Sequence, residues 1–216
     1  MEQKKEFFST SRKDIYCFAD NMEICRKLLT GGAKIIQLRN KHIDDTAFKN
    51  LAREMLSLVR SFDDAILIIN DRVDIATEIM ADGIHIGLED ENYREVITRV
   101  PDNMIVGVSV DTVKEAVEAE QAGAAYVGAG AVFPTPTKTD AVVIGIDELH
   151  NIVRAVKVPV VAIGGISMEN IQQVMETGAQ YYAIISEINN SQDIPARLNE
   201  FFTIIGGKGE REKEKK

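Results

Sequence analysis

Short apolar runs alternate along this chain with longer segments in which apolar residues recur every three or four positions. This alternation is typical of βα units that build a parallel sheet. The runs at 66–69 and 158–163 are apolar at consecutive positions, as expected for strands that are covered on both faces. We predict strands over 15–20, 34–39, 65–71, 83–87, 104–110, 125–132, 158–164 and 181–186.

The segments between these strands have the pattern of amphipathic helices. Over 112–121 the apolar residues fall on one side, and we expect Thr112 to cap this helix and Gly123 to end it. A second helix is expected over 167–177, with Ser167 as its cap. Four helix-to-strand connections, at 31–33, 81–83, 122–124 and 177–179, each contain a glycine close to an alanine. We expect the glycine to end the helix in each of them.

Eight βα units in 216 residues fit a single-domain α/β protein of the (β/α)8 TIM-barrel class. An open doubly wound sheet usually carries a glycine-rich turn after its first strand, whereas the first strand here runs into Asp20 and Asn21. We expect the barrel domain to span 15–205. An N-terminal extension over 1–14 should precede it, and a disordered charged tail over 206–216 should follow.

The composition narrows the classes of partner. With 25 basic and 34 acidic residues the net charge is −9, and no basic cluster occurs before the tail, so we expect no nucleic-acid partner. No apolar run reaches the roughly 20 residues of a membrane span, and the N-terminus lacks the apolar core of a secretory signal. We therefore expect a cytoplasmic protein in which Cys17 and Cys25 are buried thiols. The sequence leaves open whether the chain forms a homo-oligomer.

The end of the second strand carries the first candidate binding residues. Gln37, Arg39 and Lys41 are spaced by two, so on an extended chain their side chains point the same way. Two cations aimed into a barrel mouth are costly to desolvate unless they meet an anion. The alternative is that both are ordinary surface cations.

Carboxylates follow the next two strands. Asp71 and Asp90 are expected to meet at the barrel mouth, where one or two carboxylates together with a substrate phosphate would suit Mg2+. The alternative is that each one caps the helix that follows it. His85 is expected to be a buried, hydrogen-bonded residue within its strand, and His42 and His150 to lie on the surface.

Two further features indicate phosphate ligands. Ser109 lies near the end of the fifth strand, and the loop 133–140 carries Lys138 after two stiffening prolines, so the loop is either an anion clamp or a rigid turn. Gly164 and Gly165 after the seventh strand, and Ser186 after the eighth, lie where barrels of this class bind phosphate through backbone N–H groups. Two anion sites imply two phosphorylated small-molecule substrates, or one substrate with phosphate at both ends.

From Ile15 to about Phe201 the motifs resemble, in order, those of the thiamine phosphate synthase (thiamine-phosphate pyrophosphorylase) family. The Pro-Thr-Pro-Thr-Lys loop is the most discriminating of them. The segments that carry the resemblance are 37–41, 69–76, 81–87, 89–90, 107–109, 133–138, 140–141 and 161–166.

The resemblance implies a transferase that joins 4-amino-5-hydroxymethyl-2-methylpyrimidine diphosphate to 4-methyl-5-hydroxyethylthiazole phosphate and releases pyrophosphate. It implies Mg2+ at Asp71 and Asp90, with Arg39, Lys41, Ser109 and Lys138 as catalytic residues. The pyrimidine diphosphate would contact Gln37, Arg39, Lys41, Asn70, Ser109 and Lys138, and the thiazole phosphate would contact Thr135, Thr137, Gly165, Ile185 and Ser186.

The chain departs from the family pattern at several positions. Leu88 replaces a usual glutamine, Asp111 a frequent histidine, Asn40 a usual glutamate and Ala131 a usual proline. Glu187, beside Ser186, would repel an incoming phosphate unless its side chain turns away.

Two alternative functions stay open from the sequence. One is a thiazole tautomerase, a related barrel that carries a histidine after the serine of the fifth strand and lacks the Pro-Thr-Pro-Thr-Lys loop. The other is a non-catalytic barrel that binds a phosphate ligand.

Overall fold

Each strand pairs in parallel with the next and the last pairs with the first, which closes the sheet into a barrel. The structure is a computed structural model that describes residues 7–87, 91–136 and 142–210. The strands are β1 Asp14–Ala19, β2 Ile35–Leu38, β3 Ile66–Asn70, β4 Gly83–Ile86, β5 Ile105–Val110, β6 Tyr126–Ala129, β7 Val160–Ile163 and β8 Tyr181–Ala183. The helices are α1 Met22–Thr30, α2 Asp45–Val59, α3 Val73–Glu78, α4 Tyr93–Arg99, α5 Val113–Ala122, α6 Gly145–Ala155, α7 Ile171–Glu176, α8 Ser186–Asn189 and α9 Ile194–Glu210.

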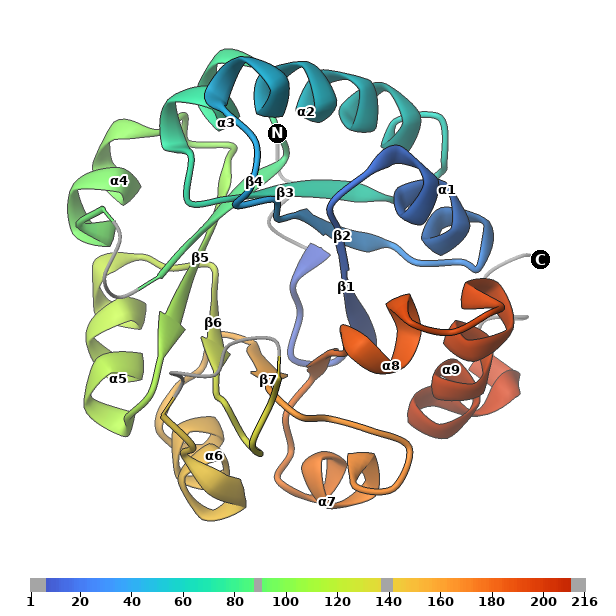
Figure 1. Ribbon diagram of the computed structural model, residues 1–216. Helices are drawn as coiled ribbons and strands as arrows, with labels where there is room; N and C mark the ends of the chain where they lie inside the picture. The colour runs from blue at the N-terminus through green and yellow to red at the C-terminus, as the bar shows by residue number, and fades with distance from the viewer. Residues whose placement is uncertain (1–6, 88–90, 137–141, 211–216) are drawn as a thin grey trace.

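The predicted barrel class is confirmed, and the helices surround the ring of strands (Figure 1). All eight predicted strands are present, but several end earlier than predicted. β6 stops at Ala129 because Gly130 takes φ 154 and leaves the strand. β8 stops at Ala183 because the short helix α8 begins at Ser186, the last residue of the predicted strand.

Alternation along the strands divides the apolar side chains between two cores. Inward side chains such as Tyr16, Ile68 and Val161 fill the barrel. Outward side chains such as Cys17 and Leu67 pack against the ring of helices. Both faces of each strand are therefore buried, which is why the strand sequences are apolar at consecutive positions.

The two helices predicted in detail differ in outcome. Helix α5 begins and ends as predicted, because Thr112 and Glu115 form a capping box and Gly123 is left-handed at φ 101. Helix α7 begins at Ile171 rather than at Ser167, so that prediction was wrong. The Asn170 side chain accepts a hydrogen bond from the Ser167 backbone N–H at 2.8 Å, which holds the intervening residues in a turn.

Three of the four predicted glycine turns contain a left-handed glycine, at Gly32, Gly123 and Gly178. The turn 81–83 was interpreted wrongly. Gly83 is the first residue of β4, and a Cβ there would lie 2.6 Å from the Ile105 carbonyl oxygen. This glycine is needed for the close approach of β4 to β5, and Met80 supplies the left-handed residue of the turn at φ 53.

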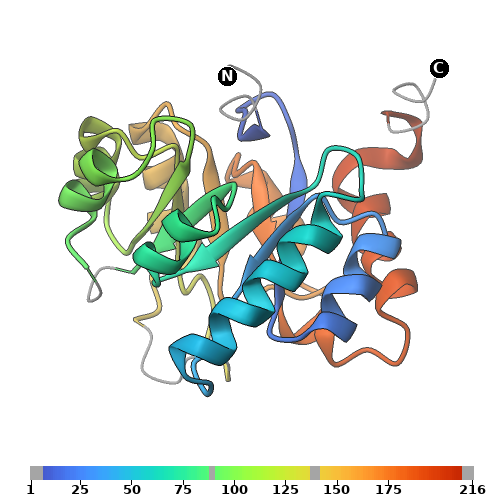
Figure 2. The same ribbon diagram turned by 90° about the horizontal axis from the view of Figure 1, so that it is seen from above.

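The described part of the N-terminal extension contributes one side chain to the barrel interior. Phe8 is buried and stacks on Tyr126, with ring centroids 4.1 Å apart. The Ser9 backbone N–H donates to the Tyr181 hydroxyl at 2.9 Å. This pale blue segment lies inside the ring of strands in Figure 1 and at the upper end of the barrel in Figure 2. It closes the end at which the strands begin.

The predicted tail begins inside a helix. Helix α9 continues to Glu210, so 206–210 are helical in the structure, and 211–216 lie outside the described residues. The disordered tail stays a prediction. Leu198, Phe201 and Ile205 are buried against the barrel, and the helix runs on past the last of them. The described part of the chain contains no helix with the length and apolar composition of a bilayer span.

Gly107 tests how tightly the barrel interior is packed. A Cβ at this position would lie 2.0 Å from the Tyr126 ring, and that ring is fully buried. We expect Gly107→Ala to lower the free energy of unfolding by about 1–3 kcal/mol. Denaturant titration followed by circular dichroism measures this change.

Gly206→Ala is the matched control, because a Cβ there meets nothing within 4 Å on an exposed position of α9. It should stabilise the protein by up to about 1 kcal/mol through helix propensity. Equal changes in the free energy of unfolding for the two substitutions would show that the interior at Gly107 is not tightly packed.

Candidate functional site

A cavity of about 460 Å3 opens at the carboxyl ends of the strands. Its volume lies within the range of small-molecule sites. The structure brings ten of the predicted site residues to its wall: Gln37, Arg39, Lys41, Asn70, Asp71, Ser109, Thr135, Gly165, Ile185 and Ser186. Asp90, Thr137 and Lys138 lie outside the described residues, as does Leu88. The binding roles of all these residues stay predictions.

The cations after β2 face the cavity as their spacing indicated. Arg39 is half-buried, and within the described residues its guanidinium has no hydrogen-bond or ion-pair partner. Lys41 is more exposed, and its Nζ lies 3.5 Å from Asp71 Oδ2. A half-buried guanidinium that none of the described carboxylates neutralises favours an anionic ligand over the surface-cation alternative.

Asp71 is held at the cavity by its neighbour in sequence. It takes a left-handed backbone at φ 60, and Asn70 Nδ2 donates to its Oδ2 at 2.5 Å. The N-cap residue of α3 is Arg72, which makes no side-chain cap hydrogen bond. The structure therefore gives no support to the alternative in which Asp71 serves as the helix cap.

These residues fit a magnesium site of the kind that takes one or two protein carboxylates. The described residues contain no group of three or more His, Cys, Asp or Glu side chains that could hold a metal. Mg2+ keeps water and substrate phosphate oxygens among its ligands and needs no closed protein cage. Asp71 supplies one hard oxygen ligand at the cavity, and the sequence places Asp90 after the neighbouring strand β4.

The cavity floor is a chain of hydrogen bonds whose tyrosines the sequence analysis missed. Gln37 Nε2 donates to the Tyr16 hydroxyl at 2.8 Å, and this hydroxyl lies 2.8 Å from that of Tyr126. His85 connects the Tyr126 hydroxyl, 3.0 Å from its Nδ1, with Ser109 Oγ, 3.0 Å from its Nε2. His85 is hydrogen-bonded as predicted, but it is only half-buried and lines the cavity.

Burial is the main reason that the pKa of Tyr126 is raised well above its usual value, and burial also raises the pKa of Tyr16. Both side chains are therefore neutral phenols. No local signal in the sequence points to Tyr126. Its ring fits because Gly107 of the adjacent strand β5 is its partner, and only the closed barrel fixes that pairing.

The loops after β7 and β8 form the wall at which the second phosphate is expected. Gly164 and Gly165 are left-handed, at φ 101 and φ 65. A Cβ at Gly165 would lie 2.6 Å from the Pro134 carbonyl oxygen, so this glycine lets the loop after β7 pack against the loop after β6. Helix α8 starts at Ser186, with its first turn beside the cavity.

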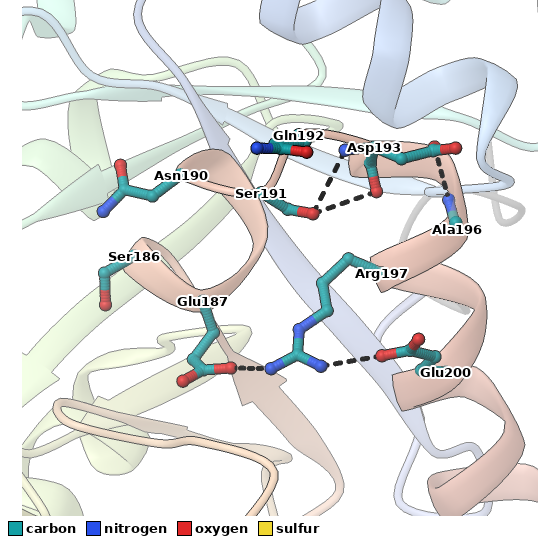
Figure 3. A pocket seen from close by; sticks show the side chains of 9 residues that line it. All are labelled: Ser186, Glu187, Asn190, Ser191, Gln192, Asp193, Ala196, Arg197 and Glu200. Carbon is teal, nitrogen blue, oxygen red and sulfur yellow. Dashed lines mark hydrogen bonds and ion pairs between the residues drawn. The ribbon is translucent and has the colours of Figure 1, made fainter.

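Glu187 does not line this cavity. Its carboxylate pairs with Arg197 of α9, and Arg197 also pairs with Glu200 at 2.7 Å (Figure 3). The three side chains lie in a separate depression of about 530 Å3 between α8 and the start of α9. The expected repulsion of a phosphate is therefore reduced, because the carboxylate is turned away and neutralised.

The chain matches the family model described as thiamine monophosphate synthase over residues 7–188. It is 42% identical over 184 residues to a thiamine-phosphate synthase of Pyrococcus furiosus, which covers 85% of this chain and 88% of that protein. A thiamine-phosphate synthase of Clostridium acetobutylicum is 38% identical over 201 residues, or 93% of this chain and 94% of the relative.

Solved structures show the same likeness. Thiamine phosphate pyrophosphorylase from Pyrococcus furiosus superposes with a TM-score of 0.83 at 36% identity, over 93% of this chain and 96% of that one. A 3-hexulose-6-phosphate synthase, at 18% identity and a TM-score of 0.64, covers 89% of this chain and all of its own, and it shares the fold alone.

The anion site can be tested with inorganic pyrophosphate as the probe. We expect Arg39→Ala to weaken pyrophosphate binding at least about tenfold, because a charge-assisted hydrogen bond to a half-buried cation is lost. Isothermal titration calorimetry measures the dissociation constant.

Arg53→Ala serves as the control, because the Arg53 guanidinium pairs with Glu78 at 2.9 Å on the outer surface. Its dissociation constant should match that of the unmodified protein. Unchanged binding by Arg39→Ala would show that the cavity does not use this cation.

Proposed function

The chain belongs to the thiamine monophosphate synthase family, whose members are transferases, and from this premise we propose its substrates and its site chemistry. The pyrimidinylmethyl group of 4-amino-5-hydroxymethyl-2-methylpyrimidine diphosphate is transferred to 4-methyl-5-hydroxyethylthiazole phosphate, and pyrophosphate leaves. The observation that carries the proposal is the half-buried Arg39 guanidinium, which has no partner among the described residues and lies with Lys41 in a cavity of substrate size.

The diphosphate belongs to the side of the cavity formed by β2, β3 and β5. Arg39 and Lys41 face the position of the leaving group, and they stabilise the negative charge that develops on it. Asn70 and Ser109 add polar contacts from the neighbouring strands. In the structure Lys41 pairs with Asp71. A bound diphosphate would compete for this lysine.

Asp71 and Asp90 are the residues that would hold Mg2+. When bound there, the ion supplies positive charge for the departing pyrophosphate. The Asn70 amide, which donates to Asp71, keeps the carboxylate oriented toward the cavity.

The thiazole phosphate belongs to the wall formed by the loops after β6, β7 and β8. Thr135, Gly165, Ile185 and Ser186 line this part of the cavity, and Thr137 follows in the same loop as Thr135. A phosphate anchored here orients the ring nitrogen for attack on the pyrimidine methylene carbon. The nitrogen carries its own lone pair, so the chemistry needs no general base.

The same proposal includes a cytoplasmic location. It also includes substrates that are small phosphorylated molecules rather than nucleic acids or lipids. They rest on the acidic composition of the chain and on the polar cavity.

Pyrophosphate release separates this function from its alternatives. With both substrates and Mg2+, we expect stoichiometric formation of pyrophosphate and thiamine phosphate, and chelation of the metal should stop it. Binding of the substrates without release would favour the non-catalytic barrel. Isomerisation of a thiazole carboxylate phosphate would favour the tautomerase, although Asp111 stands at the position of the tautomerase histidine.

Lys138→Ala tests the cation that the resemblance places over the cavity. We expect kcat to fall about a hundredfold or more, because one preorganised group that stabilises the leaving charge is removed. Lys157→Ala, which removes an exposed lysine remote from the cavity lining, should leave kcat unchanged. Thermal melts should show both variants folded, and full turnover by Lys138→Ala would refute the assignment.

A further inference from the structure

The hydrogen-bond chain under the cavity connects two lining residues that come from strands three apart in the barrel. Gln37 on β2 and Ser109 on β5 are its ends, and Tyr16, Tyr126 and His85 lie between them. Tyr16 and Tyr126 are at most 1% exposed. The positions of the protons in this chain decide what each end can offer a ligand.

The protons can be placed from the Gln37 end. Gln37 Nε2 can only donate, so the Tyr16 oxygen accepts from it. Within the described residues, the only acceptor that the structure provides for the Tyr16 proton is the Tyr126 oxygen. A buried hydroxyl proton without an acceptor is costly. Tyr16 therefore donates to Tyr126.

The same reasoning continues to the other end. Because the Tyr126 oxygen accepts from Tyr16, its own proton points to His85 Nδ1. His85 is then neutral, with its proton on Nε2, and it donates to Ser109 Oγ. Ser109 keeps its own proton for another partner, and its side chain lines the cavity.

The packing around the chain favours a single proton arrangement. Phe8 stacks on Tyr126 from below, and the hydroxyls of Tyr16 and Tyr126 are sealed from the end at which the strands begin. Gly107 provides the space for the Tyr126 ring, and a Cβ at Gly128 would lie 3.0 Å from the His85 ring. The rings are held where their polar atoms meet, and hydrogen bonds in such a setting strengthen one another.

We propose that Tyr16, Tyr126 and His85 are positioning residues that form a one-way hydrogen-bond relay beneath the substrate. The relay makes Ser109 a hydrogen-bond donor toward the cavity and leaves the Gln37 amide oxygen as an acceptor. A ligand that fits both ends carries an anionic or other acceptor group near β5 and an N–H donor near β2. This inference rests on the proposed function, because an aminopyrimidine diphosphate has both features.

The tautomer of His85 tests the relay without any measurement of activity. The chain has three histidines, and the other two, His42 and His150, are exposed. Long-range proton–nitrogen NMR spectra of the 15N-labelled full chain, with His85→Asn to assign the signals, should show His85 neutral with its proton on Nε2. A proton on Nδ1, or a mixture of tautomers, would overturn the one-way relay even if the enzyme assay succeeds.

Kinetics then test what the relay does. Tyr126→Phe should lower kcat/KM for the pyrimidine diphosphate about three- to tenfold, the factor expected for one hydrogen bond, and it should change KM for the thiazole phosphate less than twofold. The control is Tyr182→Phe, which removes a buried hydroxyl that donates to the Ala179 carbonyl at 2.7 Å outside the relay. It should change neither constant.

A double-mutant cycle separates positioning from a general loss of stability. If Tyr126 acts through Ser109, the effect of Tyr126→Phe should shrink when Ser109→Ala is already present. An equal loss in both backgrounds would show that Tyr126 has only a structural role. An inactive unmodified enzyme would instead refute the proposed function and leave the tautomer result standing.

Discussion

The closure of the sheet between β1 and β8 is the constraint on which the rest of the molecule depends. The register pairs Asp14 with Tyr181 and Tyr16 with Ala183, so the first strand completes the wall that the last one leaves open. Closure gathers all the carboxyl ends of the strands around one opening. It also creates an interior that water does not reach, in which every polar side chain needs a partner from another strand.

The interior changes in character along the barrel axis. Near the end at which the strands begin, Phe8, Tyr126 and Tyr181 form an aromatic cluster that the N-terminal segment helps to build. The hydroxyl groups of Tyr16 and Tyr126 meet the polar residues of the cavity floor, Gln37 and His85. Tyr16 and Tyr126 thus contribute their rings to the core and their oxygens to the site. Packing and site geometry are consequently set by the same side chains.

Charge is distributed differently inside and outside the cavity. The chain carries a net charge of −9, yet the mouth presents Arg39 and Lys41, which suits anionic ligands. Glu187, the carboxylate expected to repel the second phosphate, forms an ion pair with Arg197 in a depression outside the cavity. The pair belongs to α8 and α9, so the last helix of the barrel contributes to the electrostatics of a site that it does not line.

The sequence by itself determined the barrel class, the place of every strand and ten of the residues that line the cavity. Alternation of side chains along a strand is local, so the spacing of Gln37, Arg39 and Lys41 was enough to aim them together. Only the tertiary structure decided what meets across the barrel. Tyr16 and Tyr126 are 110 positions apart, Phe8 comes from a segment predicted to be a mere extension, and Gly83 serves strand contact rather than a turn. No local pattern records these contacts, because they arise only when strands distant in sequence close around one interior.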